Sequence, residues 1–342
     1  MSTKRLLEID NLTTTFHIHV GQVQAVRGIS LHVDQGEAVG IVGESGSGKS
    51  VSMLSLMRLL PDYARISADR ILFEGQDLTH ASVDQVRRLS GDRIGMVFQD
   101  PMTSLNPLMT IGRQMQETLR VHRKMSRADA ARRVRELLGL VDIPDPDSRQ
   151  KQYPHELSGG MRQRVMIGMA IASNPSLVIA DEPTTALDVT IQAQILALLK
   201  GLMDKIGTSI ILITHDLGVI AGMCSRVVVM YGGCIVEEGL SREIFYTPRH
   251  PYTWGLLRSV PRKEGDHAPL IPIQGTPPDL INPPPGCPFE PRCPHAMRIC
   301  PHAMRICRTA MPGVTRLSDT HRLRCYLMDE GAPRVAWEGG RA

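Results

Sequence analysis

The most constraining feature of this chain is a short glycine-rich run, residues 43–50, which reads GESGSGKS. It fits the pattern G-x-x-x-x-G-K-[ST], whose glycines let the backbone curl so that N–H groups and a helix N-terminus face phosphate oxygens. The mainly apolar residues 37–42 before it predict a buried strand, and residues 51–60 after it predict a helix. This context predicts a nucleoside triphosphate site rather than an ordinary Gly/Ser-rich turn that holds a lysine.

Each part of this loop has an expected role. Lys49 is expected to reach the β- and γ-phosphates, and the Ser50 hydroxyl is expected to ligate Mg²⁺. The positions expected to surround the phosphates are Gly43, Ser45, Gly46 and Gly48. The sequence therefore predicts ATP or a similar nucleotide, with Mg²⁺, as the ligand.

Length, charge and hydropathy exclude several classes of protein. The 342 residues allow two domains, or one large domain with an appendage, and 42% of them are hydrophobic. A net charge of +4 is too mild to indicate a nucleic-acid partner. No stretch approaches 18 consecutive apolar residues, and the first ten residues carry charges where a secretory signal would be apolar. We therefore expect a cytosolic chain that binds no nucleic acid.

The strand patterns predict two kinds of sheet. Residues 6–33 alternate in strand-like pieces with glycine turns, and residues 70–73 form another short piece, which together favour a small antiparallel layer. Residues 177–180 and 209–213 are continuous apolar, β-branched runs. Such runs are typical of parallel strands buried on both faces. The fold class is therefore expected to be α/β, with a phosphate-loop core and an antiparallel β subdomain.

Helical spacing and proline content organise the rest of the chain. Helical spacing dominates residues 111–140 and 159–173, which predicts a helical subdomain. From residue 247 the composition shifts toward proline, so a boundary is expected near residue 260. The expected domains are a nucleotide-binding domain, a small irregular cysteine-rich C-terminal unit and a flexible tail, at residues 5–260, 261–330 and 331–342.

Two adjacent carboxylates follow the apolar run at residues 177–180. Asp181 can hold Mg²⁺, directly or through water, and Glu182 can polarise the attacking water as a general base. By themselves these residues could equally cap a strand before Pro183. With a phosphate loop upstream, they predict a nucleotide hydrolase.

Residues 157–164, LSGGMRQR, form a second candidate anion site. Ser158, Gly159 and Gly160 stand directly before a predicted helix, whose N-terminus favours negative charge. These residues resemble the signature of the ATP-binding cassette (ABC) family, which is usually Leu-Ser-Gly-Gly-Gln. Met161 replaces the glutamine here, a departure common among the peptide importers of that family. The resemblance covers residues 5–260 and implies that the signature closes over ATP held by an opposite subunit.

The same resemblance assigns further residues. Gln99 matches the loop glutamine that touches Mg²⁺ and water and couples to the membrane partner, and His215 matches the switch histidine that contacts the γ-phosphate. Asp188 matches the loop that crosses the cassette dimer. Phe16 is the candidate for stacking on adenine, although neighbouring histidines leave the register open. Without the resemblance, the sequence would favour a surface position for the Gln99 amide. It would also favour a structural, hydrogen-bonded role for His215 rather than a catalytic one.

Residues 100–107 and 247–253 look like segments typical of oligopeptide and dipeptide importer ATPases. The resemblance thus implies an ATPase that energises a di- or oligopeptide importer through ATP-driven cassette dimerisation. Its implied partners are a second ABC ATPase, identical or not, two transmembrane permease subunits and an extracytoplasmic solute-binding protein, and its implied location is peripheral, on the cytoplasmic face of the inner membrane. Alternatives are another solute such as nickel or glutathione, an export cassette, or a non-transport ABC ATPase.

Five of the seven cysteines lie between residues 287 and 325, within the proline-rich segment. The importer tails that the chain resembles include some with a [4Fe–4S] cluster, which implies that four of these thiols are ligands. The seven-residue sequence PHAMRIC occurs twice in tandem at residues 294–307. Either copy could supply the third ligand, which would be Cys300 or Cys307. We favour Cys300 over Cys307 because it keeps the spacing to the upstream cysteines short. The seven duplicated residues would then lie in a loop, which costs little free energy to lengthen. The expected set is Cys287, Cys293, Cys300 and Cys325, with Cys307 as the alternative and reduced, metal-free thiols as the competing interpretation.

Overall fold

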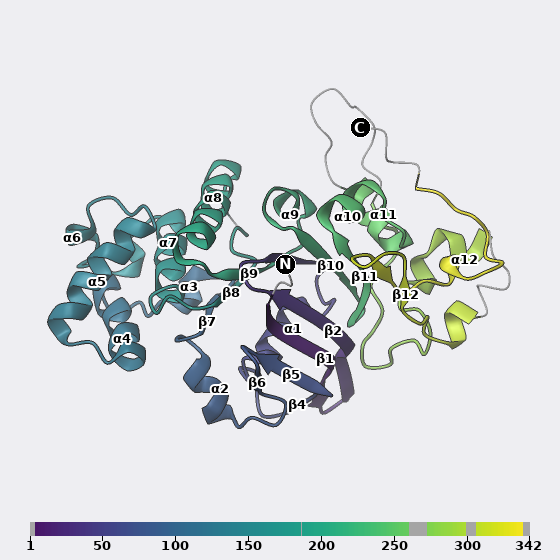
Figure 1. Cartoon of the computed structure of the whole chain (residues 1–342), viewed down its shortest axis with the longest axis horizontal. Coiled ribbons are helices and arrows are strands. Elements are labelled where there is room, and N and C mark those ends of the chain that lie inside the picture. Colours follow the sequence, from purple (N-terminus) through teal and green to yellow (C-terminus); the bar gives the residue numbers. More distant parts are fainter. Residues whose placement is uncertain (1–3, 186, 260–271, 299–305, 338–342) are drawn as a thin grey trace. The chain divides into compact units, whose positions relative to one another are not determined.

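The structure, a computed structural model, describes residues 4–185, 187–259, 272–298 and 306–337. The chain forms two compact units, each built from several segments (Figure 1). The first unit comprises Met1–Leu6, Val33–Ala38 and His80–Ile213, and the second comprises Leu7–His32, Val39–Thr79 and Thr214–Ala342.

The first unit contains parallel strands. Strand β8 (Leu177–Asp181) pairs in parallel with β7 (Ile94–Val97) on one side and with β9 (Ser209–Thr214) on the other. Every residue of β8 and β9 is buried, as the continuous apolar runs predict. Because β8 is a buried central strand, the two carboxylates at its carboxyl end start from a rigid position.

Helices make up the rest of the first unit. Helix α4 (Ile111–Arg123) ends at Lys124, whose φ of 51° is left-handed, so the helical pattern over 111–140 is two helices rather than one. Helix α5 (Arg127–Leu140) then begins at Ser126, which accepts a hydrogen bond from the Asp129 amide. The remaining helices are α2 (Val83–Leu89), α3 (Pro101–Ser104), α6 (Pro146–Arg149), η1 (Pro154–Glu156), α7 (Gly159–Ala170) and α8 (Val189–Ile206).

The second unit contains the expected antiparallel layer. Long strands β1 (Arg5–Ile18) and β2 (Gly21–Asp34) lie side by side, and β5 (Arg70–Phe73) and β6 (Gln76–Asp77) continue the sheet in the order β2-β1-β5-β6. Strand β4 (Ala64–Ser67) also pairs with β1.

A second group of strands in this unit includes β3, the strand that leads into the phosphate loop. Strand β10 (Arg226–Tyr231) pairs in parallel with β3 (Ala38–Val42) and antiparallel with β11 (Cys234–Leu240). Strands β13 (Arg322–Leu323) and β12 (Thr315–Arg316) extend the sheet beyond β11. The helices of this unit are α1 (Lys49–Leu56), α9 (Leu217–Met223), α10 (Ser241–Tyr246), α11 (Pro251–Arg258), η2 (Glu290–Arg292), α12 (Pro294–Arg298) and η3 (Tyr326–Met328).

The expectation of a separate cysteine-rich unit is not supported. Strand β13 pairs with β11, so that Glu237 lies opposite Leu323, and the segment that carries the cysteines belongs to the same compact unit as the phosphate loop. A pairing of only two residues has no periodic signature in the sequence, which is why the composition suggested an independent appendage. In the part of the chain that the structure describes, none of the helices has the length and apolar character needed to cross a membrane.

Candidate nucleotide site

The phosphate loop lies in the second unit between β3 and α1, the context that the sequence predicts. Gly43 has a φ of 154°, and a Cβ there would lie 2.2 Å from the Met230 carbonyl oxygen. Gly48 has a φ of 98°, and a Cβ there would lie 2.4 Å from the Ala25 carbonyl oxygen. Neither position can therefore take a side chain without moving the backbone of a neighbouring strand.

Polar atoms in this loop fit a phosphate ligand. The Lys49 side chain is 6% exposed, and its Nζ donates to the carbonyl oxygens of Gly43, at 2.7 Å, and Glu44, at 2.9 Å. The buried Ser47 Oγ has no hydrogen-bond partner among the described residues. An orphaned hydroxyl beside a backbone that admits no Cβ matches a cradle for phosphate oxygens. Ser50, in the first turn of α1, is half-buried.

In the first unit, the end of β8 brings three predicted residues close together. Asp181 is buried at the end of the strand, and Glu182 follows with a left-handed φ of 46°. The Glu182 Oε2 accepts a hydrogen bond from Gln99 Nε2 at 3.2 Å and another from Thr185 Oγ1 at 2.8 Å. A positive φ is uncommon at a non-glycine residue and marks a turn at Glu182. The structure thus brings Gln99 and Glu182 into contact, and it adds Thr185 as a second donor to the carboxylate.

The signature residues lie at the start of α7 in the first unit. Ser158 is exposed, and its Oγ accepts a hydrogen bond from the Met161 amide at 3.3 Å. Gly159 and Gly160 form the first residues of this twelve-residue helix. Asp188 occupies the same kind of position before α8, where its carboxylate accepts from the Ile191 amide at 2.9 Å. The N-terminus of α7 therefore carries no negative cap and favours an anion, whereas that of α8 already holds the Asp188 carboxylate.

The other two predicted residues belong to the second unit. His215 is exposed just after β9. Phe16 is half-buried near the end of β1, and its ring centroid lies 6.0 Å from that of Tyr63, which is 55% exposed. Tyr63 was missed in the sequence, because no motif links it to β1. It offers a second aromatic surface beside the one predicted for adenine.

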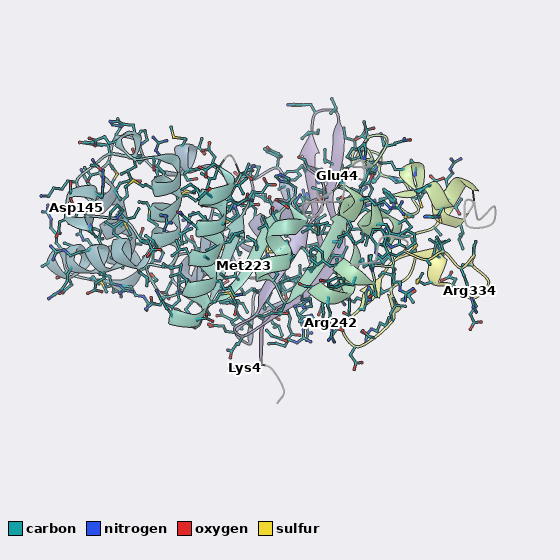
Figure 2. The ribbon with its side chains drawn as sticks, turned by 90° about the horizontal axis from the view of Figure 1, so that it is seen from above. Lys4, Glu44, Asp145, Met223, Arg242 and Arg334 are labelled. Atoms are coloured by element: carbon teal, nitrogen blue, oxygen red, sulfur yellow. The ribbon has the colours of Figure 1, made fainter. Side chains whose placement is uncertain are left out.

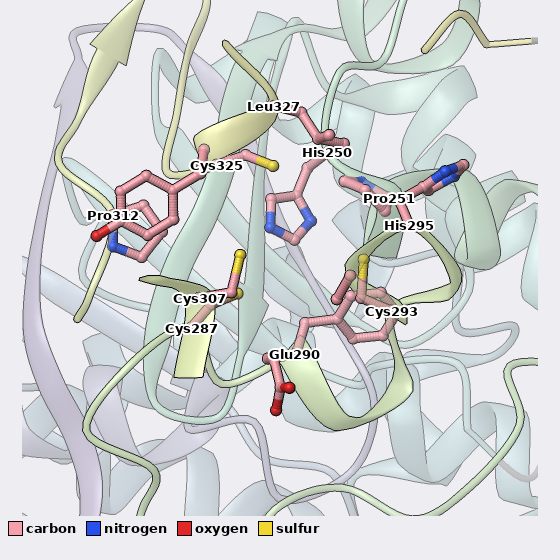
Figure 3. A pocket seen from close by; sticks show the side chains of 13 residues that line it. His250, Pro251, Cys287, Glu290, Cys293, His295, Cys307, Pro312, Cys325 and Leu327 are labelled. Carbon is pink, nitrogen blue, oxygen red and sulfur yellow. The ribbon is translucent and has the colours of Figure 1, made fainter. Parts of the chain in front are cut away.

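Four of the five clustered cysteines line one pocket in the second unit (Figure 3). Figure 3 shows the thiols of Cys287, Cys293, Cys307 and Cys325 facing this pocket together with the His250 ring. The side chains of His295 and Glu290 also line it. The pocket has a volume of about 20 Å³, which is room for a single water molecule. Cys300 lies outside the described residues, so the thiol observed at this position is that of Cys307.

Burial shifts the pKa of several groups in this pocket in the direction that favours the neutral form. Burial raises the pKa of the Cys287 thiol to about 12 and raises the pKa of the Cys325 thiol as well. Burial also lowers the pKa of His250 to about 4, against the opposing effect of Glu237. Because a metal ligand must be a thiolate, these thiols would have to ionise to bind one.

The described residues do not support an iron–sulfur cluster. Within residues 4–185, 187–259, 272–298 and 306–337, no three His, Cys, Asp or Glu side chains form a group that could hold a metal ion. The donor atoms are of the right kind, but the pocket is small and burial raises the pKa of Cys287, Cys293 and Cys325. No step of the chemistry below depends on such a cluster.

Two family models match this sequence. The model described as ABC transporter matches residues 26–185, which include the phosphate loop and the end of β8. The model described as oligopeptide/dipeptide transporter, C-terminal region, matches residues 236–300. The second match begins in β11, which agrees with the observation that the C-terminal segment extends the sheet of the second unit.

Similar proteins cover nearly the whole chain. An oligopeptide transport ATP-binding protein, OppD of Bacillus subtilis (strain 168), is 54% identical over 97% of this chain and 91% of its own length. A dipeptide transport ATP-binding protein, DppD of the same organism, is 52% identical over 98% of both chains. Among solved structures, a dimeric ATP-binding cassette, MJ0796, bound to ADP and Pi, superposes with a TM-score of 0.62 at 28% identity, covering 69% of this chain and 99% of that one.

Proposed function

Because the chain belongs to the ABC transporter family, we propose that it is the ATP-hydrolysing subunit that energises a membrane importer of dipeptides and oligopeptides. The similarity to OppD and DppD over at least 97% of this chain supports peptides as the solute. The alternatives weighed on the sequence, namely nickel, glutathione, export or a role outside transport, are not favoured by these relatives.

The geometry at Glu182 is the observation that carries the catalytic proposal. Its carboxylate follows a buried central strand and is oriented by two donors, Gln99 and Thr185. A carboxylate held in this way can accept a proton from water as the water attacks the γ-phosphate. The two hydrogen bonds orient the Glu182 carboxylate before a nucleotide binds.

The other residues then bind and orient MgATP. The phosphate loop and Lys49 hold the β- and γ-phosphates. Ser50, Asp181 and Gln99 would hold Mg²⁺, which would supply positive charge to neutralise the phosphates. Lys49, which donates to loop carbonyls in this structure, turns its ammonium group to the phosphates. His215 contacts the γ-phosphate and Phe16 stacks on the adenine.

The signature is proposed to act on the ATP of a second cassette. Ser158 and the N-terminus of α7 contact the γ-phosphate bound by the partner, and Asp188 crosses between the two cassettes. ATP binding thus holds the two cassettes together, and ATP hydrolysis releases them. The transporter alternates between these two states. The proposed complex contains a second ABC ATPase, two transmembrane permeases and an extracytoplasmic solute-binding protein, with this chain on the cytoplasmic face of the inner membrane.

A finer proposal concerns the cysteines. We propose that, if a [4Fe–4S] cluster forms, its ligands are Cys287, Cys293, Cys325 and the thiol of Cys307, since Cys307 lies at the pocket. This choice differs from the sequence-based preference for Cys300. It would require the thiols to ionise and the pocket to widen.

Reconstitution tests the proposed function. The chain would be purified with its permeases and partner ATPase, placed in liposomes, and supplied with the solute-binding protein and a labelled tripeptide. We expect peptide uptake that requires MgATP and is abolished by Lys49→Ala. A matched Lys151→Ala variant, which changes an exposed lysine outside the proposed site, should transport normally. Stimulation of hydrolysis by glutathione or a nickel chelate, and not by peptide, would contradict the assignment of the solute.

A further inference from the structure

An ion pair joins the C-terminal segment to the phosphate loop within the second unit. Arg292, the last residue of η2, donates from both terminal nitrogens to the carboxylate of Glu44, at 2.5 Å to Oε2 and 3.0 Å to Oε1. Glu44 is the second residue of the loop and is labelled in Figure 2. The Arg292 side chain is 5% exposed and that of Glu44 is 28% exposed. A bidentate pair that is this well shielded from water is stronger than an ordinary surface pair.

The guanidinium group of Arg292 is fixed on its other sides as well. Its Nε donates to the Gln274 carbonyl at 2.9 Å, and one terminal nitrogen donates to the Ile273 carbonyl at 3.1 Å. The other terminal nitrogen donates to the Tyr231 hydroxyl at 3.0 Å. Because a guanidinium is planar and its donors have a fixed geometry, these contacts leave Arg292 a single position.

Glu44 is held at its backbone too. Its amide donates to the Tyr252 hydroxyl at 2.8 Å, and its carbonyl accepts from Lys49 Nζ at 2.9 Å. The Tyr252 ring packs against that of Phe289, with centroids 5.3 Å apart, and Phe289 immediately precedes η2. The C-terminal segment therefore supports the loop through both the ion pair and the aromatic contacts.

A carboxylate inside a phosphate-binding loop is electrostatically unfavourable for an anionic ligand. An isolated Glu44 would repel a triphosphate, and its side chain would be free to turn toward the loop interior. Arg292 removes both effects, because it supplies a compensating charge and holds the carboxylate through two hydrogen bonds.

We propose that Arg292 is a positioning residue for nucleotide binding, which neutralises Glu44 and holds the phosphate loop ready for MgATP. The proposal rests on the proposed function only in that the loop binds MgATP. It also gives the C-terminal segment a role in the ATP site, because Arg292 is the last residue of η2.

Equilibrium binding of MgATP to the purified full chain tests the inference, with circular dichroism and the melting temperature as controls for folding. Arg292→Ala should weaken MgATP binding about tenfold, the change that about 1.4 kcal/mol of lost interaction produces. Arg292→Lys keeps the charge without the bidentate geometry and should give a smaller loss. The double variant Arg292→Ala, Glu44→Gln should recover most of the affinity, since it removes the uncompensated carboxylate.

Arg322→Ala is the matched control. Arg322 also forms a partly buried ion pair in the second unit, to Glu238, and it is outside the proposed nucleotide site. Its loss should lower the melting temperature and leave MgATP affinity unchanged.

The outcomes separate positioning from simple stabilisation. The affinity lost in Arg292→Ala should shrink at high salt, because salt screens the repulsion of Glu44. If Arg292→Ala lowers only the melting temperature, or if the double variant binds no better than Arg292→Ala, the proposal is overturned. If Arg292→Ala does not fold, the MgATP affinity of Arg292→Lys and its dependence on salt test the proposal instead. Arg292→Lys that lowers only the melting temperature would overturn it. Failure of the unmodified chain to bind MgATP would instead overturn the proposed function.

Discussion

Replacing Glu182 with glutamine should separate nucleotide binding from hydrolysis. Glutamine has nearly the same shape, so Thr185 can still donate to its side-chain oxygen, and the backbone φ of 46° is not disturbed by a change in volume. What is lost is the ability to accept a proton from water. General-base catalysis typically contributes about 10²–10⁴ in rate, so we expect kcat to fall by that factor. This corresponds to about 2.7–5.5 kcal/mol in the activation free energy.

Thr185→Val provides a graded comparison. It removes one hydrogen bond, of 2.8 Å, to the Glu182 carboxylate and keeps the carboxylate itself. A hydrogen bond to a charged group contributes about 1.5 kcal/mol at the lower end of its range, so hydrolysis should fall by about tenfold. The carboxylate would remain the base but would be less well oriented.

The assay is steady-state ATP hydrolysis by the assembled transporter, with MgATP affinity measured in parallel. Glu182→Gln should bind MgATP as tightly as the unmodified protein and accumulate the closed cassette dimer. Hydrolysis by Glu182→Gln at the unmodified rate would refute the role of this carboxylate. A larger loss in Thr185→Val than in Glu182→Gln would show that orientation, and not proton transfer, dominates.

Three further predictions concern the signature, the fold and the cysteines. The Ser158→Arg variant would be assembled in one complex with an unmodified partner cassette, and it should impair ATP hydrolysis at the partner's site more than at its own. Equal impairment of both sites in single-turnover assays would contradict this. Glu238→Ala leaves the buried Arg226 without its carboxylate partner. The free energy of unfolding, measured by urea denaturation, should fall by about 3–5 kcal/mol. A loss below about 1 kcal/mol would show that the ion pair is dispensable. Any iron and sulfide that the protein retains on anaerobic purification should be lost in Cys307→Ser and kept in Cys300→Ser, whereas a colourless, folded, metal-free protein would rule the cluster out.

Local motifs in the sequence determined the nucleotide-binding elements of this protein. The strand, loop and helix around Gly43 and Lys49 follow from consecutive residues, because glycine content and apolar runs act on the backbone over a few positions. The same holds for the end of β8, where the buried strand predicts the place of Glu182. Resemblance to a family then supplied the roles of isolated residues such as Gln99, for which spacing alone gives no signal.

Only the tertiary structure decided what the C-terminal segment does. Arg292 and Glu44 are 248 residues apart, and nothing near either residue predicts their pairing. The two-residue strand β13 is too short for any periodicity, yet its pairing with β11 places this segment in the unit that carries the phosphate loop. Cys307 likewise faces the thiol pocket because of packing, and Cys300, which the loop-length argument favours, lies outside the described residues. Contacts between distant segments depend on how whole surfaces fit together, and such complementarity is not encoded in any short stretch of residues.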